Sequence, residues 1–95
     1  MKEIEFEWDQ WNIQKNEIKH GVSHIEAQSA FYDPLYKLYA DLKHSLTTEK
    51  RFILYGKSME GKILMIGFTL RRNKIRIITA RSASKKERTI YESKN

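Results

Sequence analysis

The amino-acid sequence predicts an α+β fold, a small antiparallel sheet with two helices before it and one helix after it. Two capped helical segments occupy the first third of the chain, and three strand-like segments joined by short turns lie between residues 51 and 80. Helices that are segregated in sequence from consecutive strands are typical of α+β proteins. The length of 95 residues and the hydrophobic fraction of 40% predict a single domain over residues 1–95 with one modest core.

The N-terminal segment alternates apolar and acidic residues. Ile4, Phe6 and Trp8 are separated by glutamates, which predicts a short half-buried strand. By their spacing, Phe6, Trp8, Trp11 and Phe31 are expected to anchor the core.

The first helix is expected to follow this strand directly. Asp9 is suited to cap it and Gly21 to end it, and Trp11, Gln14 and Ile18 fall on one stripe between these two residues. The helix therefore carries one marked apolar stripe.

A second helix is predicted by the capping-box spacing of Ser23 and Glu26. Asp33 and Pro34 end it, because the residue before a proline is disfavoured in the helical region. Residues 35–42 fit either a helix or a strand, and we interpret them as a short or irregular strand.

Three strands are predicted in the second half of the chain, after a polar loop at 43–49. They cover 51–57, 62–70 and 75–80, and the last two are joined by a tight turn at 72–74. The second strand is nearly all apolar, which indicates a central position in the sheet. Ser82 or Ser84 then caps a last helix that runs through Tyr91, and Ser84 has capping-box spacing with Glu87.

The surplus positive charge lies in the C-terminal part of the chain. Residues 71–95 hold nine basic and two acidic side chains, a net charge of +7, whereas residues 1–70 hold nine basic and ten acidic side chains, a net charge of −1. Several arginines alternate with apolar residues, a spacing that fixes guanidinium groups on a sheet, where they bind phosphate bidentately. A polyanion, most simply RNA, is therefore the first partner predicted.

The sequence excludes several other classes of site. The chain has no cysteine, which excludes disulfides and thiolate metal sites. His20 and His24 are four residues apart, but Gly21 and the Ser23 cap break the helix between them, so neither a metal nor a cofactor is expected. Without a secretory signal or an apolar run long enough for a bilayer, we expect a cytoplasmic protein with no membrane partner.

Cleavage of RNA without a metal requires a base, cations that stabilise the phosphorane, and an acid for the leaving 5′-oxygen. Candidate proton carriers are Lys19, His20 and Glu49, and candidate catalytic cations are Arg51, Arg71 and Arg81. Further contacts to the RNA backbone are expected from Arg72, Lys74, Arg76, Lys85, Lys86 and Arg88.

The spacing of two arginines at one predicted strand limits which of them can share a site. Arg76 and Arg81 are an odd number of positions apart, so a regular strand would place them on opposite faces. Both can line one site only if the strand bulges, or if it ends before Arg81.

An ordered series of residue strings runs through the chain. They are Trp8-Asp9, Asn16, Lys19-His20-Gly21-Val22-Ser23, Glu26-Ala27, Phe31, Asp33-Pro34, Glu49-x-Arg51, Gly56-x-Ser58 with Gly61, Phe68-Thr69-x-Arg71, Ile75-Arg76-Ile77-Ile78-x-Ala80-Arg81-x-Ala83, and Glu87-Arg88 with Tyr91. In order and spacing these strings resemble the BrnT toxin family, from about Phe6 to Tyr91. The chain departs from the usual family pattern at Trp11 and His24, which concerns local packing.

The resemblance implies a fold similar to that of RelE and ParE, and a bacterial or phage type II toxin that cleaves RNA and arrests translation. It implies BrnA as the partner, a ribbon-helix-helix antitoxin that dimerises and binds the promoter of the operon. Operator DNA would then be contacted only through the antitoxin, in a heterotetramer with two copies of each protein. The recurrent polar positions of the family are occupied here by Lys19, His20, Glu49, Arg51, Arg71, Arg81 and Arg88.

Two alternatives remain beside a ribonuclease toxin. One is a non-catalytic module that binds nucleic acid or an antitoxin, and the other is a gyrase-targeting toxin of the ParE kind. Binding without cleavage that weakens steeply with salt would indicate the first, and inhibition of supercoiling would indicate the second.

Overall fold

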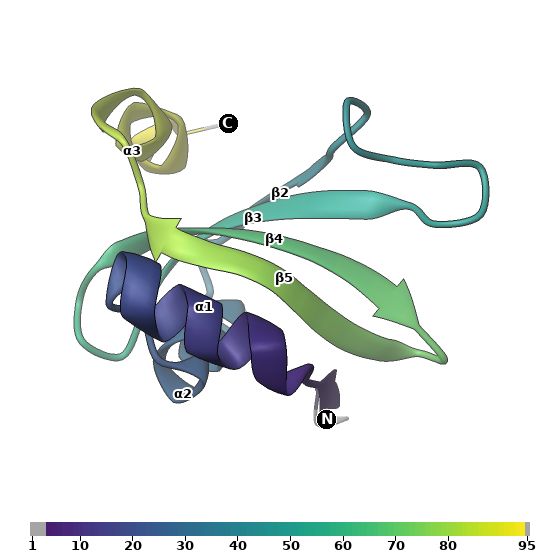
Figure 1. Cartoon of the computed structure of the whole chain (residues 1–95). Coiled ribbons are helices and arrows are strands. Elements are labelled where there is room, and N and C mark those ends of the chain that lie inside the picture. Colours follow the sequence, from purple (N-terminus) through teal and green to yellow (C-terminus); the bar gives the residue numbers. More distant parts are fainter. Residues whose placement is uncertain (1–3, 95) are drawn as a thin grey trace.

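A computed structural model describes residues 4–94, so residues 1–3 and 95 of the predicted domain lie outside the described part of the chain. One five-stranded sheet, in the order β1-β5-β4-β3-β2, forms the centre of the fold (Figure 1). The elements are β1 (Phe6–Glu7), α1 (Gln10–His20), α2 (His24–Ser29), a 3₁₀ helix (Ala30–Tyr32), β2 (Lys37–Ala40), β3 (Arg51–Lys57), β4 (Ile63–Arg71), β5 (Lys74–Ser82) and α3 (Lys85–Glu92).

The sheet is mixed, and the prediction of an antiparallel sheet is wrong at one edge. Strands β2 to β5 pair antiparallel, but β1 pairs parallel with β5, with Phe6 opposite Ile75 and Glu7 opposite Arg76. Short turns force antiparallel pairing between consecutive strands, whereas most of the chain separates β1 from β5 and leaves their relative direction open. The prediction that the apolar second strand is central is confirmed, because β4 is the middle strand.

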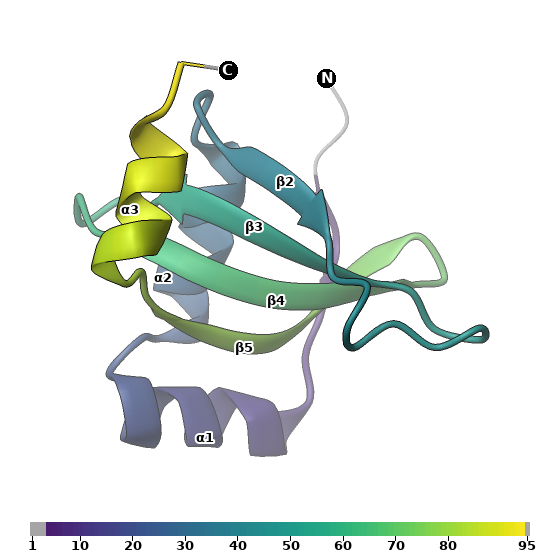
Figure 2. The same cartoon turned by 90° about the horizontal axis from the view of Figure 1, so that it is seen from above.

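Helix α2 lies against one face of the sheet and α1 runs along the outer edge of β5 on that side, whereas α3 and the loop between β2 and β3 rise over the other face (Figures 1 and 2). The core forms on the α2 side, where Leu64, Ile66 and Ile77 of the sheet are fully buried. Phe31 closes this core with edge-to-face contacts to Phe6 and Phe68, at ring-centroid distances of 5.2 and 5.1 Å. The face beneath α3 and the loop, here called the open face, carries the remaining alternate side chains of β3, β4 and β5.

Helix α1 turns its polar side to the sheet, so the expectation that Trp11 anchors the core is wrong. The Trp11 side chain is 71% exposed and that of Ile18 is 86% exposed. The reason lies in β5, whose outer edge is paired by β1 only at Ile75 and Arg76. The edge beyond these residues needs other acceptors, and the buried Asn16 supplies one, since its Oδ1 accepts from the Ala80 amide at 3.3 Å.

The predicted helix starts and the end of α1 are confirmed, whereas α2 ends at Ser29 and a 3₁₀ helix continues it to Tyr32, directly before Asp33. Asp9 caps α1 through the Trp11 amide at 2.8 Å, and Gly21 ends this helix in the left-handed region with φ 68°. Ser23 caps α2 through the Glu26 amide at 3.1 Å, but the predicted capping box is incomplete, because the Glu26 carboxylate accepts from the Ser58 hydroxyl at 2.8 Å instead. At the start of α3 the capping box is complete, and Ser84 is its N-cap.

The hairpin between β4 and β5 closes with a two-residue turn. Arg72 and Asn73 both have positive φ, 53° and 66°, the backbone that a hairpin turn of type I′ requires. The predicted tight turn is thereby confirmed, and Arg71 and Lys74 face each other across it. The ambiguous segment 35–42 contains β2, a strand at the edge of the sheet, as the interpretation favoured.

One hydrogen bond ties α3 to the segment that precedes β2. The Tyr91 hydroxyl donates to Asp33 Oδ2 at 2.5 Å, and the Lys57 amide donates to the same oxygen at 2.7 Å. Burial, followed by the bond to Asp33, raises the pKa of Tyr91 to about 12. Burial alone would raise the pKa of the Asp33 carboxyl, but the hydrogen bonds from Tyr91 and the two backbone amides of Lys57 and Leu35 lower it overall.

Replacing Tyr91 with phenylalanine is expected to lower the free energy of unfolding at neutral pH by about 1–2 kcal/mol, the worth of one hydrogen bond to a partly buried carboxylate. In the unchanged protein, the Asp33 contribution is present above the ordinary carboxyl pKa of 3.8 and is lost as the pH falls further. The Tyr91 contribution is complete below 10.0 and is lost as the pH rises towards about 12. Urea unfolding at acid, neutral and alkaline pH measures how the free energy of unfolding changes with pH at each end of the range. If this pH dependence were the same in Tyr91→Phe as in the unchanged protein, the assignment would be contradicted.

Candidate functional site

A β-bulge decides which arginines share a face of the sheet. The register between β4 and β5 shifts between Gly67 and Phe68, where Gly67 faces Thr79 and Phe68 faces Ile77. Ile78 is the extra residue, and beyond it the alternation of β5 is reversed.

As a result, Arg76 and Arg81 lie on the same face, opposite Thr69 and Met65 of β4. Arg51 also faces Thr69, and Arg71 faces Lys74, so these side chains share that face as well. The bulge that the parity of Arg76 and Arg81 required is therefore present, and both arginines belong to the open face.

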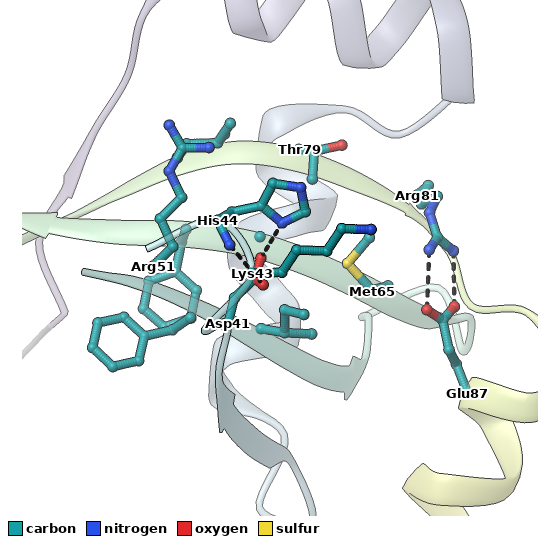
Figure 3. Close-up of a pocket in the computed structure, with 13 residues that line it drawn as sticks. Asp41, Lys43, His44, Arg51, Met65, Thr79, Arg81 and Glu87 are labelled. Atoms are coloured by element: carbon teal, nitrogen blue, oxygen red, sulfur yellow. Dashed lines mark hydrogen bonds and ion pairs between the residues drawn. The ribbon is translucent and has the colours of Figure 1, made fainter. Parts of the chain in front are cut away.

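The open face contains a cavity of about 380 Å³ between the β2–β3 loop and the start of α3. Its floor is mostly apolar, and it includes Ile53, Met65 and Phe68. Its charged lining comes from separate elements: Asp41, Lys43 and His44 from the loop, Arg51 from β3, Arg81 from β5, and Glu87 from α3. In Figure 3, Arg51 and Arg81 stand at the two ends of this group, with His44 and Lys43 between them.

At one end of the cavity, Arg81 and Glu87 form a bidentate ion pair. The Arg81 Nη1 and Nη2 atoms lie 2.8 and 3.0 Å from the two carboxylate oxygens of Glu87. The hydrogen bond to Arg81 is the main reason that the pKa of the Glu87 carboxyl lies below its ordinary value, and the same bond raises the pKa of Arg81. Because Glu87 also closes the capping box of α3, the pair fixes Arg81 against the helix.

Beyond the Arg51 end of the cavity, Glu49 lies between two arginines without a hydrogen bond to either. Its carboxylate oxygens are 3.8 Å from Arg51 Nη2 and 3.7 Å from Arg71 Nη2, beyond hydrogen-bond distance. The buried Nε of Arg51 has no hydrogen-bond partner within residues 4–94. These two guanidinium groups therefore keep donors that an incoming phosphate oxygen can use.

Asp41 and His44 form a third polar group at the cavity. The His44 ring Nδ1 lies 2.8 Å from Asp41 Oδ2, and the His44 backbone amide lies 3.3 Å from the other oxygen. Neither residue belongs to the predicted site. Their spacing of three residues within a polar loop was the only available signal, since a loop gives no face on which to place them.

The remaining predicted site residues lie elsewhere. Lys19 and His20 end α1, which runs along the outer edge of β5 on the α2 side of the sheet (Figures 1 and 2). Arg76 is held at the β1 edge by Glu7 and Asp9, at 2.8 and 3.1 Å. Arg72 and Lys74 are exposed at the hairpin end of the open face, Lys85 and Lys86 are exposed in the first turn of α3, and Arg88 donates to the Ala83 carbonyl at 3.1 Å.

Within residues 4–94, no group of three histidine, aspartate or glutamate side chains is arranged to hold a metal ion. Over the same residues, no helix is both long enough and apolar enough to span a bilayer.

Comparison with protein families gives a match over residues 8–87 to the family described as the ribonuclease toxin BrnT of type II toxin–antitoxin systems. The chain belongs to the BrnT family. BrnT proteins are ribonuclease toxins, and a type II toxin has a protein antitoxin as its partner. A search of curated protein sequences finds no significant match.

The fold is also similar to a solved BrnT structure, the crystal structure of the Brucella abortus ribonuclease toxin. The match has a TM-score of 0.64 at 24% sequence identity, and it covers 87% of this chain and 100% of that one. At this identity the likeness concerns the fold, and it supports the α+β architecture of one sheet flanked by helices that BrnT proteins share.

Proposed function

We propose that this BrnT-family chain is a metal-independent endoribonuclease that binds the scissile phosphodiester of RNA at the open face and thereby arrests translation. The single observation that carries the proposal is the bulge at Ile78, which turns Arg81 to the same face as Arg51 and Arg71. Guanidinium groups held on a rigid sheet can stabilise the charge that develops on the phosphorane, and others on the same face can hold the neighbouring phosphates. We also propose that the chain is a single domain related to RelE and ParE, and that it acts in the cytoplasm.

The proposal assigns different work to the two ends of the cavity. Arg51 and Arg71 bind the phosphate with the donors that Glu49 leaves unused. Arg81 keeps two of its five N–H donors beyond its bonds to Glu87 and the Ser82 carbonyl, and it presents them to an adjacent phosphate of the RNA. Exposed basic residues beyond the cavity, namely Arg72, Lys74, Lys85 and Lys86, would contact neighbouring phosphates of the RNA.

The partner is proposed to be a BrnA-like ribbon-helix-helix antitoxin, in a complex with two copies of each protein that reaches operator DNA only through the antitoxin. A stored toxin must cover its positive surface, and the net charge of residues 71–95 is +7. The antitoxin is therefore expected to cover the surface from Arg71 to Arg88 with acidic or hydrogen-bonding groups, or to block RNA from its edge.

A second candidate function is a binding module without catalysis. The observation that favours it is the Arg81–Glu87 pair, whose short bidentate contacts are those of a structural ion pair. In that case Arg81 holds α3 in place and has no role towards a phosphate.

Cleavage of RNA in EDTA by the purified chain, with and without ribosomes, distinguishes the two candidates. The unchanged chain is expected to cleave, and Arg81→Lys to cleave about 10²-fold more slowly, because lysine keeps the charge and loses the planar fork. Glu87→Gln is the matched variant: it removes the charge that competes for Arg81 and keeps an oxygen for the Ser84 amide, so its rate should stay within a few-fold of the unchanged chain. RNA that is bound but left intact would support the binding module and contradict the proposed enzyme.

A further inference from the structure

The Asp41–His44 pair has the geometry of an oriented imidazole base. An ionised carboxylate only accepts hydrogen bonds, so the short contact with Asp41 Oδ2 places the ring proton of His44 on Nδ1. The lone pair is then on Nε2, which makes no hydrogen bond to residues 4–94. The exposures fit this arrangement, since the Asp41 side chain is 16% exposed and that of His44 is 59% exposed.

The turn that carries His44 is tied to the backbone of Arg51. The Asp41 amide donates to the Arg51 carbonyl at 2.8 Å. The Ser45 hydroxyl donates to the Asp41 carbonyl at 2.7 Å and accepts from the Arg51 amide at 2.9 Å. Three hydrogen bonds therefore fix the imidazole relative to the start of β3, and such fixed geometry is what a reacting group needs.

The same cavity brings His44 together with the phosphate-binding cations. The charged groups that face it are Asp41 and Lys43 from its own loop, Arg51 from β3, Arg81 from β5 and Glu87 from α3. The predicted proton carriers Lys19 and His20 do not line this cavity, because they end α1, which runs along the outer edge of β5 on the α2 side (Figures 1 and 2). An imidazole base beside guanidinium groups is the combination that transesterification of RNA requires.

We infer that His44 is the general base that activates the ribose 2′-hydroxyl of the RNA substrate, and that Asp41 is the residue that positions it, an inference that rests on the proposed ribonuclease function. The Nε2 lone pair takes the 2′-hydroxyl proton as the 2′-oxygen forms a bond to phosphorus. The bond from phosphorus to the 5′-oxygen breaks, and the leaving 5′-oxygen takes a proton from solvent water. The products are a 2′,3′-cyclic phosphate and a 5′-hydroxyl end.

The test measures cleavage of a labelled mixed-sequence RNA, together with binding of its uncleavable 2′-O-methyl counterpart. His44→Gln is expected to lower the cleavage rate at neutral pH by about 10²–10⁴-fold, the usual contribution of a general base. Binding should stay within a few-fold, because the arginines that hold the phosphate are unchanged. An equal loss of binding and rate in His44→Gln would overturn the inference, since His44 would then be a binding residue.

The pH profile separates a base from a structural side chain. The unchanged chain should lose activity as acid protonates the imidazole, and His44→Gln should lose this limb of the profile. Added imidazole should restore part of the rate to His44→Ala, and Asp41→Asn should lower kcat with little change in KM. A His44→Gln profile that keeps the acid limb would contradict the assignment.

Two other histidine variants make the outcome specific. His24→Gln removes an imidazole from α2, on the other face of the sheet, and is expected to leave the rate unchanged. His20→Gln tests the predicted alternative: a large loss there, with none in His44→Gln, would overturn the inference and leave the ribonuclease function standing. An unchanged chain that leaves RNA intact under every condition would overturn both.

Discussion

Replacing Arg51 with alanine is expected to lower the rate of RNA cleavage by about 10²–10³-fold, the typical cost of removing one donor that stabilises a developing oxyanion. Arg51 lines the cavity and makes no hydrogen bond to the carboxylate beside it. Its Nε has no hydrogen-bond partner within the described chain, and its Nη2 stays 3.8 Å from Glu49. The Nη donors of Arg51 therefore stay available to a phosphate that enters the cavity. Single-turnover kinetics measure the effect on the chemical step.

Two variants show whether the loss comes from geometry or from charge. Arg51→Lys should recover only a small part of the rate, because the ammonium group cannot bind a phosphate in the bidentate manner. Lys15→Ala removes one positive charge from the exposed side of α1, across the sheet, and its rate should match that of the unchanged chain. Equal losses in Arg51→Ala and Lys15→Ala would mean that net charge alone attracts the RNA.

Replacing Ile66 with alanine is expected to lower the free energy of unfolding by about 2–5 kcal/mol, since it leaves a cavity among fully buried side chains. Ile66 is 0% exposed at the centre of β4. The matched variant is Ile18→Ala on α1, where the same side chain is 86% exposed and the expected change stays within about 0.5 kcal/mol. Urea unfolding of both variants tests the orientation of α1. A large loss of unfolding free energy in Ile18→Ala would show that the Ile18 side of α1 is packed, which would contradict this orientation.

Features that depend only on a short stretch of the chain could be predicted from the sequence. Asp9, Gly21 and Ser84 mark helix ends because a cap bonds to backbone groups only a few residues away. The turn at Arg72 and Asn73 was predictable for the same reason. The exposed Trp11 was not, because the orientation of α1 follows from an unpaired edge of β5, and β5 lies more than half the chain away.

The residues of the candidate site likewise fall into those that the sequence could predict and those that depend on distant contacts. Glu49, Arg51 and Arg71 were predicted together, and strand alternation and a hairpin are enough to bring them to one face. Arg81 needed the bulge at Ile78, which depends on the register with β4 and leaves no clear mark in the sequence of β5. His44 was missed because its position depends on hydrogen bonds between an irregular loop and Arg51.

The measurement that tests the central claim most directly is a nuclear magnetic resonance titration of the full chain with 2′-O-methyl RNA, which binds without being cleaved. The claim is that the RNA phosphate lies on the open face, between the β2–β3 loop and α3. It predicts that the side-chain signals of Arg51, Arg71 and Arg81 shift together, along with the ring of His44. Shifts confined to α1, at residues such as Lys15 and Lys19, with the three arginine signals unmoved, would contradict it.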